Sequence, residues 1–149
     1  MQSRWNGDEA NRFIQAALAA GQSEALGLRI YTSRIIGQDP DLVLHGGGNT
    51  SAKVTAEDGS EIMHIKGSGW DLDTIEAPGL PAVRMEPLLA ARDGGKLSDP
   101  EMVALLRSAL LDAASPNPSV EALLHGFLPF RFVDHTHATA ALALANQPD

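Results

Sequence analysis

Apolar side chains recur at helical spacing in two segments near the start of the chain. The first predicted helix covers residues 8–20, and Gly21 follows where a helix would stop. The second predicted helix covers residues 23–36 and ends before the break at 37–40. The residues expected to face the core are Phe13, Ile14, Ala17 and Leu18 in the first helix, and Leu28, Tyr31 and Ile35 in the second.

A third helix is predicted over residues 98–112, where the start signal is strongest. Ser98 is followed three residues later by Glu101, which is the pattern of a capping box, and Pro100 suits the first turn. Its expected buried stripe consists of Val103, Leu106 and Leu110.

Shorter apolar runs predict strands between and after these helices. The turn residues Asp58 and Gly59 separate two such runs, as in a hairpin. Pro78 and Pro81 restrict the next run to the edge of a sheet. Helices mixed with neighbouring strands favour an α/β fold, namely a layered α/β/α domain with a central mixed or antiparallel sheet. The predicted strands are 42–44, 51–55, 61–65, part of 77–85, and 130–137, and the predicted short helices are 119–126 and 138–145.

Composition narrows the class of protein. The chain has 149 residues, 44% of them hydrophobic, which suits one domain over residues 1–149. Its formal net charge of -8 argues against general binding of nucleic acid or of anionic membranes. It has no cysteine, which excludes disulfides and thiolate metal sites, and no apolar leader or membrane-length run. We therefore expect a cytoplasmic protein.

The segment His135-Thr136-His137 carries the clearest chemical signal. In a strand, residues two apart point to the same side, so both imidazoles would project together. Neutral imidazole nitrogens are ligands for zinc, and a catalytic zinc site keeps a position open for water or substrate. Taken alone, the pattern also fits two surface histidines on an edge strand.

Glu121 opens a predicted short helix upstream of these histidines. A carboxylate at a helix start can simply offset the helix dipole, or it can act as a general base near a metal. His125 lies four residues later on the same helix face. It is a candidate partner of the site, a substitute ligand or a core histidine.

Three loops rich in glycine, serine or both indicate a site for an oxyanion such as a phosphate. They cover residues 45–51, 66–69 and 117–119. Glycines let backbone N–H groups approach an oxyanion closely, and hydroxyl groups add donors. Each loop alone is equally typical of an ordinary turn. Neither the phosphate-binding loop of nucleotide hydrolases nor the dinucleotide-binding fingerprint occurs in the sequence.

Taken in order, these motifs resemble the class II aldolase/adducin family over about residues 23–147. The motifs are Gly48-Asn49-Thr50-Ser51, Lys66-Gly67-Ser68-Gly69, Pro118-Ser119-Val120-Glu121 and His135-Thr136-His137. The longer runs HGGGNTSAK, KGSGWDL and PSVEALLHGFLPFRFVDHTHA are most similar to the aldolase part of bifunctional rhamnulose-1-phosphate aldolase/alcohol dehydrogenases. We expect no dehydrogenase activity and no nicotinamide cofactor from this chain.

The resemblance implies a zinc-dependent aldolase that cleaves a ketose 1-phosphate. It assigns His135 and His137 as metal ligands and Glu121 as the acid/base. It assigns phosphate binding to Asn49, Ser68, Gly69 and Ser119. Rhamnulose 1-phosphate would give dihydroxyacetone phosphate and lactaldehyde. The resemblance also implies a homo-oligomer, a tetramer, with a sugar phosphate as its small-molecule partner. Lys66 is our own addition, as a charge beside the phosphate.

Two departures from the family pattern leave alternatives open. Val120 stands where many members carry a second serine, and the family's third zinc-binding histidine lies well downstream of the His-x-His pair. The chain ends at Asp149, twelve residues after His137, so we expect a fragment that is incomplete at the C-terminus. The alternatives are another sugar-phosphate aldolase or epimerase of the family, and a non-catalytic, adducin-like interaction module.

Overall fold

A four-stranded antiparallel sheet forms the centre of the computed structural model, which describes residues 3–147. The strand order is β3-β2-β1-β4, so β3 and β4 are the two edge strands. Met1, Gln2, Pro148 and Asp149 lie outside the described residues. The strands are β1 (Asn49–Thr55), β2 (Glu61–Ile65), β3 (Ala82–Arg84) and β4 (Phe132–His135).

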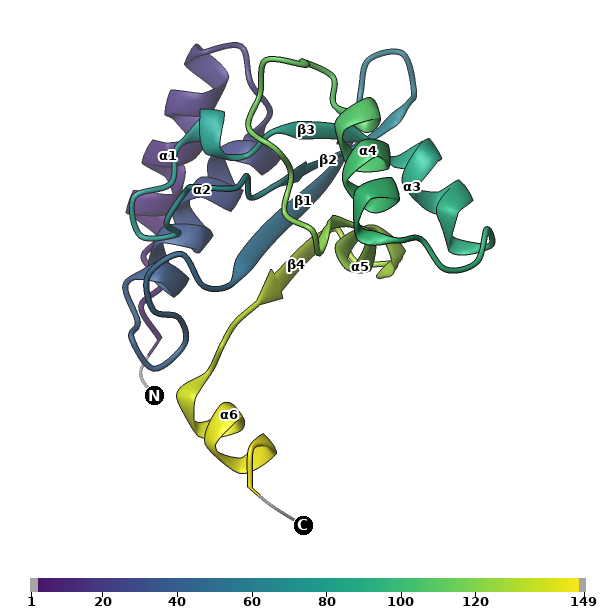
Figure 1. The fold of residues 1–149 in the computed structure, drawn as a ribbon. Helices are drawn as coiled ribbons and strands as arrows, with labels where there is room; N and C mark the ends of the chain where they lie inside the picture. Colours follow the sequence, from purple (N-terminus) through teal and green to yellow (C-terminus); the bar gives the residue numbers. More distant parts are fainter. Residues whose placement is uncertain (1–2, 148–149) are drawn as a thin grey trace.

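Helices cover both faces of this sheet (Figure 1). One face carries α1 (Gly7–Ala19) and α2 (Glu24–Gly37). The other carries α3 (Met85–Arg92), α4 (Asp99–Ala109) and α5 (Ala122–Phe127). A short 3-10 helix, η1 (Ala77–Gly79), precedes β3. The layered α/β/α prediction is therefore confirmed, with a sheet that is antiparallel throughout.

The last helix, α6 (Thr139–Ala145), stands apart from these layers (Figure 1). It buries none of its residues, and Leu144 is 78% exposed. Its first residue is tied to the body by one backbone bond, from the Thr139 N–H to the Asp41 carbonyl (3.0 Å).

Two apolar clusters hold the layers together, one on each side of the sheet. The first joins the sheet to α3, α4 and α5 through Met63, Ile65, Val83, Met85, Leu88, Leu106, Ala109, Leu110 and Ala122. The second packs α2 against the loop before β1 and the segment after β2 through Leu26, Ile30, Val43, Leu72, Ile75 and Leu80. Burial on both faces fixes which side of each strand points to which helices.

Polar caps start the main helices. The Ser23 hydroxyl accepts from the Leu26 N–H (3.1 Å) at the start of α2. The capping box at α4 is confirmed, because Glu101 accepts from the Ser98 N–H (2.8 Å) and from its hydroxyl (2.6 Å). Such contacts satisfy backbone donors that have no partner inside the helix.

Several local predictions are wrong. Residues 42–44 form no strand, because Val43 is buried in a loop without a pairing partner. The helix over Met85–Arg92 was missed, since it has eight residues and Pro87 in its first turn hides its pattern. Leu18 and Val103 are exposed rather than buried, at 48% and 39%.

Three predicted elements are shorter than expected. The helix expected over 98–112 ends at Ala109, and the segment after it pairs with β3 through Leu110 and Val83. The helix expected from residue 119 begins at Ala122, because the backbone before it pairs with another loop. The strand expected over 130–137 covers Phe132–His135, because β1 begins at Asn49 and offers no partner beyond His135. The edge strand expected within 77–85 is confirmed as β3. Within residues 3–147, no helix combines the length and apolar character that crossing a bilayer requires.

Candidate active site

The open end of the β1–β4 pair brings together two residues of the sequence motifs. Asn49 is the first residue of β1 and His135 is the last residue of β4, and they are register partners. Register partners in an antiparallel pair point to the same face, which here is the face covered by α5. The fold therefore places the Asn49 amide and the His135 imidazole next to each other.

Glu121 completes this cluster from the N-cap position of α5. Its carboxylate accepts hydrogen bonds from Asn49 Nδ2 and from His135 Nδ1, the latter at 2.9 Å. The Ser119 hydroxyl accepts from Asn49 Nδ2 at 3.2 Å. Four residues that the motifs singled out, from three separate segments, are thus in direct contact.

Electrostatics keep the Glu121 carboxylate ionised. Burial acts to raise its pKa, but hydrogen bonds from Asn49 and His135 outweigh burial, so the pKa of Glu121 lies below its ordinary value. An ionised carboxylate accepts the Nδ1 hydrogen of His135 and leaves Nε2 with a free lone pair. That nitrogen is then available to a metal ion.

The loops that precede Glu121 and follow β2 are joined by backbone hydrogen bonds. The Ser68 N–H donates to Asn117 O (2.8 Å), and the Ser119 N–H donates to Lys66 O (2.9 Å). Gly67 and Pro118 form a bridge between these two contacts. Ser68 and Ser119 lie on either side of this bridge, and both line the same cavity.

A cavity of about 370 Å³ lies between these loops and the glycine loop before β1. Lys66 is 7% exposed, and its ammonium donates to Gly46 O (3.1 Å). Burial lowers the pKa of Lys66, and the charges of Asp71 and Glu121 counteract this. The lining consists of Gly46, Gly47, Gly48, Asn49, Lys66, Gly67, Ser68, Gly69, Ser119, Val120, Glu121 and His137.

Glycine is required where this loop passes under the histidines. Gly48 has φ of +69°, and a Cβ there would lie 2.7 Å from the His135 carbonyl oxygen. A Cβ on Gly47 would lie 3.1 Å from His137 Nδ1. A side chain at either position would displace a histidine or the loop.

The two histidines of the His-x-His segment lie against each other, although His137 is beyond the end of β4. Their ring centroids are 4.9 Å apart with an interplanar angle of 60°. Among residues 3–147, no group of three His, Cys, Asp or Glu side chains is placed to hold a metal ion. The imidazoles fit two of the three protein ligands of a catalytic zinc site.

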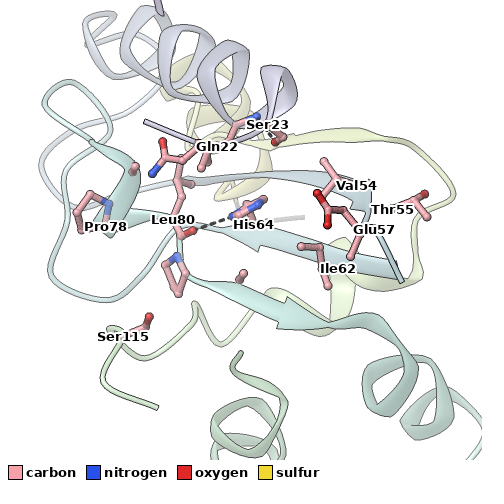
Figure 2. Close-up of a pocket in the computed structure, with 16 residues that line it drawn as sticks. Gln22, Ser23, Val54, Thr55, Glu57, Ile62, His64, Pro78, Leu80 and Ser115 are labelled. Atoms are coloured by element: carbon pink, nitrogen blue, oxygen red, sulfur yellow. Dashed lines mark hydrogen bonds between the residues drawn. The ribbon is translucent and has the colours of Figure 1, made fainter. Parts of the chain in front are cut away.

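A larger cavity of about 590 Å³ lies on the opposite face of the sheet (Figure 2). His64 lies at its centre and donates from Nδ1 to Leu80 O (3.2 Å), while Gln22, Glu57 and Ser115 lie around it. None of the residues predicted for the site lines this cavity.

Of the three alternatives for His125, the structure supports a core histidine. Its side chain is 1% exposed, and a hydrogen bond of 2.8 Å joins its Nδ1 to Ser51 Oγ. Its Nε2 has no hydrogen-bond partner among the described residues. Burial, with the nearby His135 acting in the same direction, lowers the pKa of His125 to about 4.

One polar cluster behind the site was missed from the sequence. Arg29 of α2 is 1% exposed and pairs with Asp134 of β4, from Nη2 to Oδ1 at 2.6 Å. Ser33, one turn later, contacts Thr50 through their hydroxyls (2.7 Å). The available signal was an arginine within the apolar stretch of a predicted helix.

Comparison with known proteins identifies the family to which this fold belongs. Residues 29–149 match the family model of the Class II Aldolase and Adducin N-terminal domain. The N-terminal class II aldolase domain of a conserved protein from Thermoplasma acidophilum is 38% identical, with a TM-score of 0.84. That structure matches 100% of this chain, which spans 66% of it.

A curated relative is the uncharacterized oxidoreductase YuxG of Bacillus subtilis (strain 168), 39% identical over 119 residues. The match covers 77% of this chain and 17% of that protein. The chain therefore spans about a sixth of this relative. Both the family match and the fold lead to one assignment: the chain belongs to the class II aldolase and adducin family.

Proposed function

We propose that this chain carries the site of a metal-dependent aldolase that cleaves a ketose 1-phosphate between two carbons of the sugar. The observation that carries the proposal is the contact of Asn49, Glu121 and His135 beside a glycine-lined cavity. Rhamnulose 1-phosphate is the proposed substrate, with dihydroxyacetone phosphate and lactaldehyde as products. This choice of substrate rests on the similarity of the longer sequence motifs to those of rhamnulose-1-phosphate aldolases.

Zn²⁺ is the proposed cofactor, with His135 and His137 as its ligands from this chain. When bound, zinc would act as a Lewis acid that polarises the carbonyl of the sugar. The Glu121 carboxylate fixes the ring orientation of His135 through Nδ1.

Phosphate recognition is proposed for the cavity between the loops. The Asn49 amide, the Ser68 and Ser119 hydroxyls and the backbone of Gly69 are donors of the kind that phosphate oxygens need. Lys66 lines the same cavity and supplies a positive charge. Val120 contributes no hydroxyl, and its side chain is 56% exposed.

Glu121 is the proposed acid/base. In the direction of sugar synthesis, its ionised carboxylate removes a proton from the carbon beside the ketone. In the direction of cleavage, it returns that proton to the same carbon after the carbon–carbon bond has broken. The lowered pKa of Glu121 keeps the carboxylate ionised, as a base must be before it accepts a proton.

A retro-aldol assay tests this proposal. The zinc-saturated protein is incubated with several ketose 1-phosphates, and release of dihydroxyacetone phosphate is followed by a coupled reduction. We expect cleavage that Glu121→Gln abolishes while the urea midpoint stays near that of the wild type. Cleavage that survives in Glu121→Gln would remove this residue from the chemistry.

The metal-ligand count favours a second candidate, a non-catalytic interaction module of the adducin type. Residues 3–147 supply no group of three metal ligands. Under this reading, no ketose 1-phosphate is cleaved at saturating zinc. Other aldolases or epimerases of sugar phosphates are distinguished in the same assay by the substrates that react.

A further inference from the structure

The strand that carries His135 is short and lies at the edge of the sheet. β4 has four residues and pairs only with β1 among the described strands. Figure 1 shows β4 beside β1, with the chain leaving the layers directly after it. A short edge strand has few contacts that oppose sliding along its neighbour.

The apolar pattern of β4 does not define its register. Phe132 and Val133 are adjacent, so they point to opposite faces, and both are apolar. A slip by one residue would exchange them and still leave an apolar side chain on each face. The same slip would turn His135 away from Asn49 and Glu121.

Asp134 is the β4 residue that distinguishes the two faces. It lies opposite Thr50 in the register and points to the α2 face, where Arg29 Nη2 meets its carboxylate at 2.6 Å. The Arg29 guanidinium also stacks over Phe132 at 5.7 Å and donates to Ser51 O at 3.3 Å. One side chain of α2 thus contacts both β4 residues on that face and the backbone of β1.

Burial of the Arg29 guanidinium costs free energy of folding. It is 1% exposed, and its Nε has no hydrogen-bond partner within residues 3–147. Burial lowers the pKa of Arg29, and Asp134 counteracts this. The Asp134 side chain is 48% exposed, so solvent weakens its attraction for the guanidinium, and the clearest benefit of the pair is a defined register.

We propose that the Arg29–Asp134 ion pair sets the register of β4 on β1 and thereby directs His135 and His137 to the site face. Arg29 and Asp134 are positioning residues in this account, and they act on the imidazoles through the strand. The expected effect on zinc binding rests on the proposed function, whereas the effect on the register of β4 does not.

The test separates a role in register from a role in stability. Asp134→Asn leaves the buried guanidinium without its counter-charge, so we expect a lower urea midpoint. Arg29→Met combined with Asp134→Asn removes the buried charge, and the midpoint should recover. Leu106→Ala is the matched control, because it destabilises the core beneath α4 without touching β4.

The readout is the proton–proton contact between the His135 ring and the side-chain amide of Asn49, its register partner on β1, observed by nuclear magnetic resonance without metal; we call this the ring contact. We expect it in the wild type and in Leu106→Ala, and we expect its loss in Asp134→Asn and in the double variant. Zinc affinity, measured by competition with a chelator, should fall at least about tenfold in both.

A double variant that keeps the ring contact would overturn the inference. If the double variant does not fold, Asp134→Asn is compared with Leu106→Ala at a similar urea midpoint. A ring contact retained in Asp134→Asn would then overturn the inference. A wild type that shows the ring contact but binds no zinc contradicts the proposed metal function and leaves the register inference supported.

Discussion

Protonation of His125 should destabilise the protein in mild acid. Its side chain is 1% exposed, and the pKa of His125 lies at about 4 in the folded state, against about 6.5 for an unfolded histidine. Between these two values the unfolded chain binds a proton that the folded chain does not bind. Stability from this residue is therefore complete above about pH 6.5 and is lost as the pH falls toward 4.

The magnitude follows from the size of the shift. One pKa unit corresponds to about 1.4 kcal/mol, so the full interval would cost about 3 kcal/mol. Relaxation of the surroundings around a new charge reduces this, and we expect a loss of about 2 kcal/mol.

Urea unfolding between pH 4 and pH 8 measures this loss. We compare the wild type with His125→Asn, which retains a polar group near Ser51 but does not titrate. The difference between the two free energies of unfolding should shrink as the pH falls. Ser51→Ala is the control, because it removes the hydrogen bond and keeps the titrating ring. Parallel pH profiles for the wild type and His125→Asn would refute the reasoning.

Three further predictions concern the glycine loop, the phosphate region and a helix cap. Gly48→Ala should cost at least about 1 kcal/mol more in urea unfolding than Gly59→Ala, because both have positive φ but only Gly48 also meets backbone within 3 Å; equal costs would contradict this. Lys66→Gln should raise the KM for a sugar phosphate about tenfold with a smaller change in kcat, measured by steady-state cleavage, and an unchanged KM would remove this charge from phosphate binding. Ser98→Ala should lower the free energy of unfolding by about 1 kcal/mol through loss of the capping box, and an unchanged thermal midpoint would count against it.

Local chemistry made part of the fold predictable. The helix that starts after Ser98 was found because its cap and first turn are encoded within four residues. The run 42–44 was mistaken for a strand because burial of Val43 comes from a loop packed on α2 and not from pairing. A short apolar run carries no information about which of these occurs.

In the site, too, residues in local motifs could be predicted, and contacts between distant segments could not. The order of the motifs was enough to name Asn49, Glu121 and His135, which the structure brings into contact. The Arg29–Asp134 pair joins residues far apart in the chain, and no local pattern links them. The rings of His137 and His135 lie 4.9 Å apart although His137 is outside the strand, so alternation along a strand does not by itself explain their proximity.

The zinc content of the purified chain shows whether His135 and His137 hold a metal ion. The protein is saturated with zinc, passed through gel filtration and analysed for metal, beside His135→Ala and an exposed control, His45→Ala. We expect about one zinc ion per chain in the wild type and in His45→Ala, and its loss in His135→Ala. A wild type that retains no zinc, or zinc that is retained in His135→Ala, would contradict a zinc site built on His135.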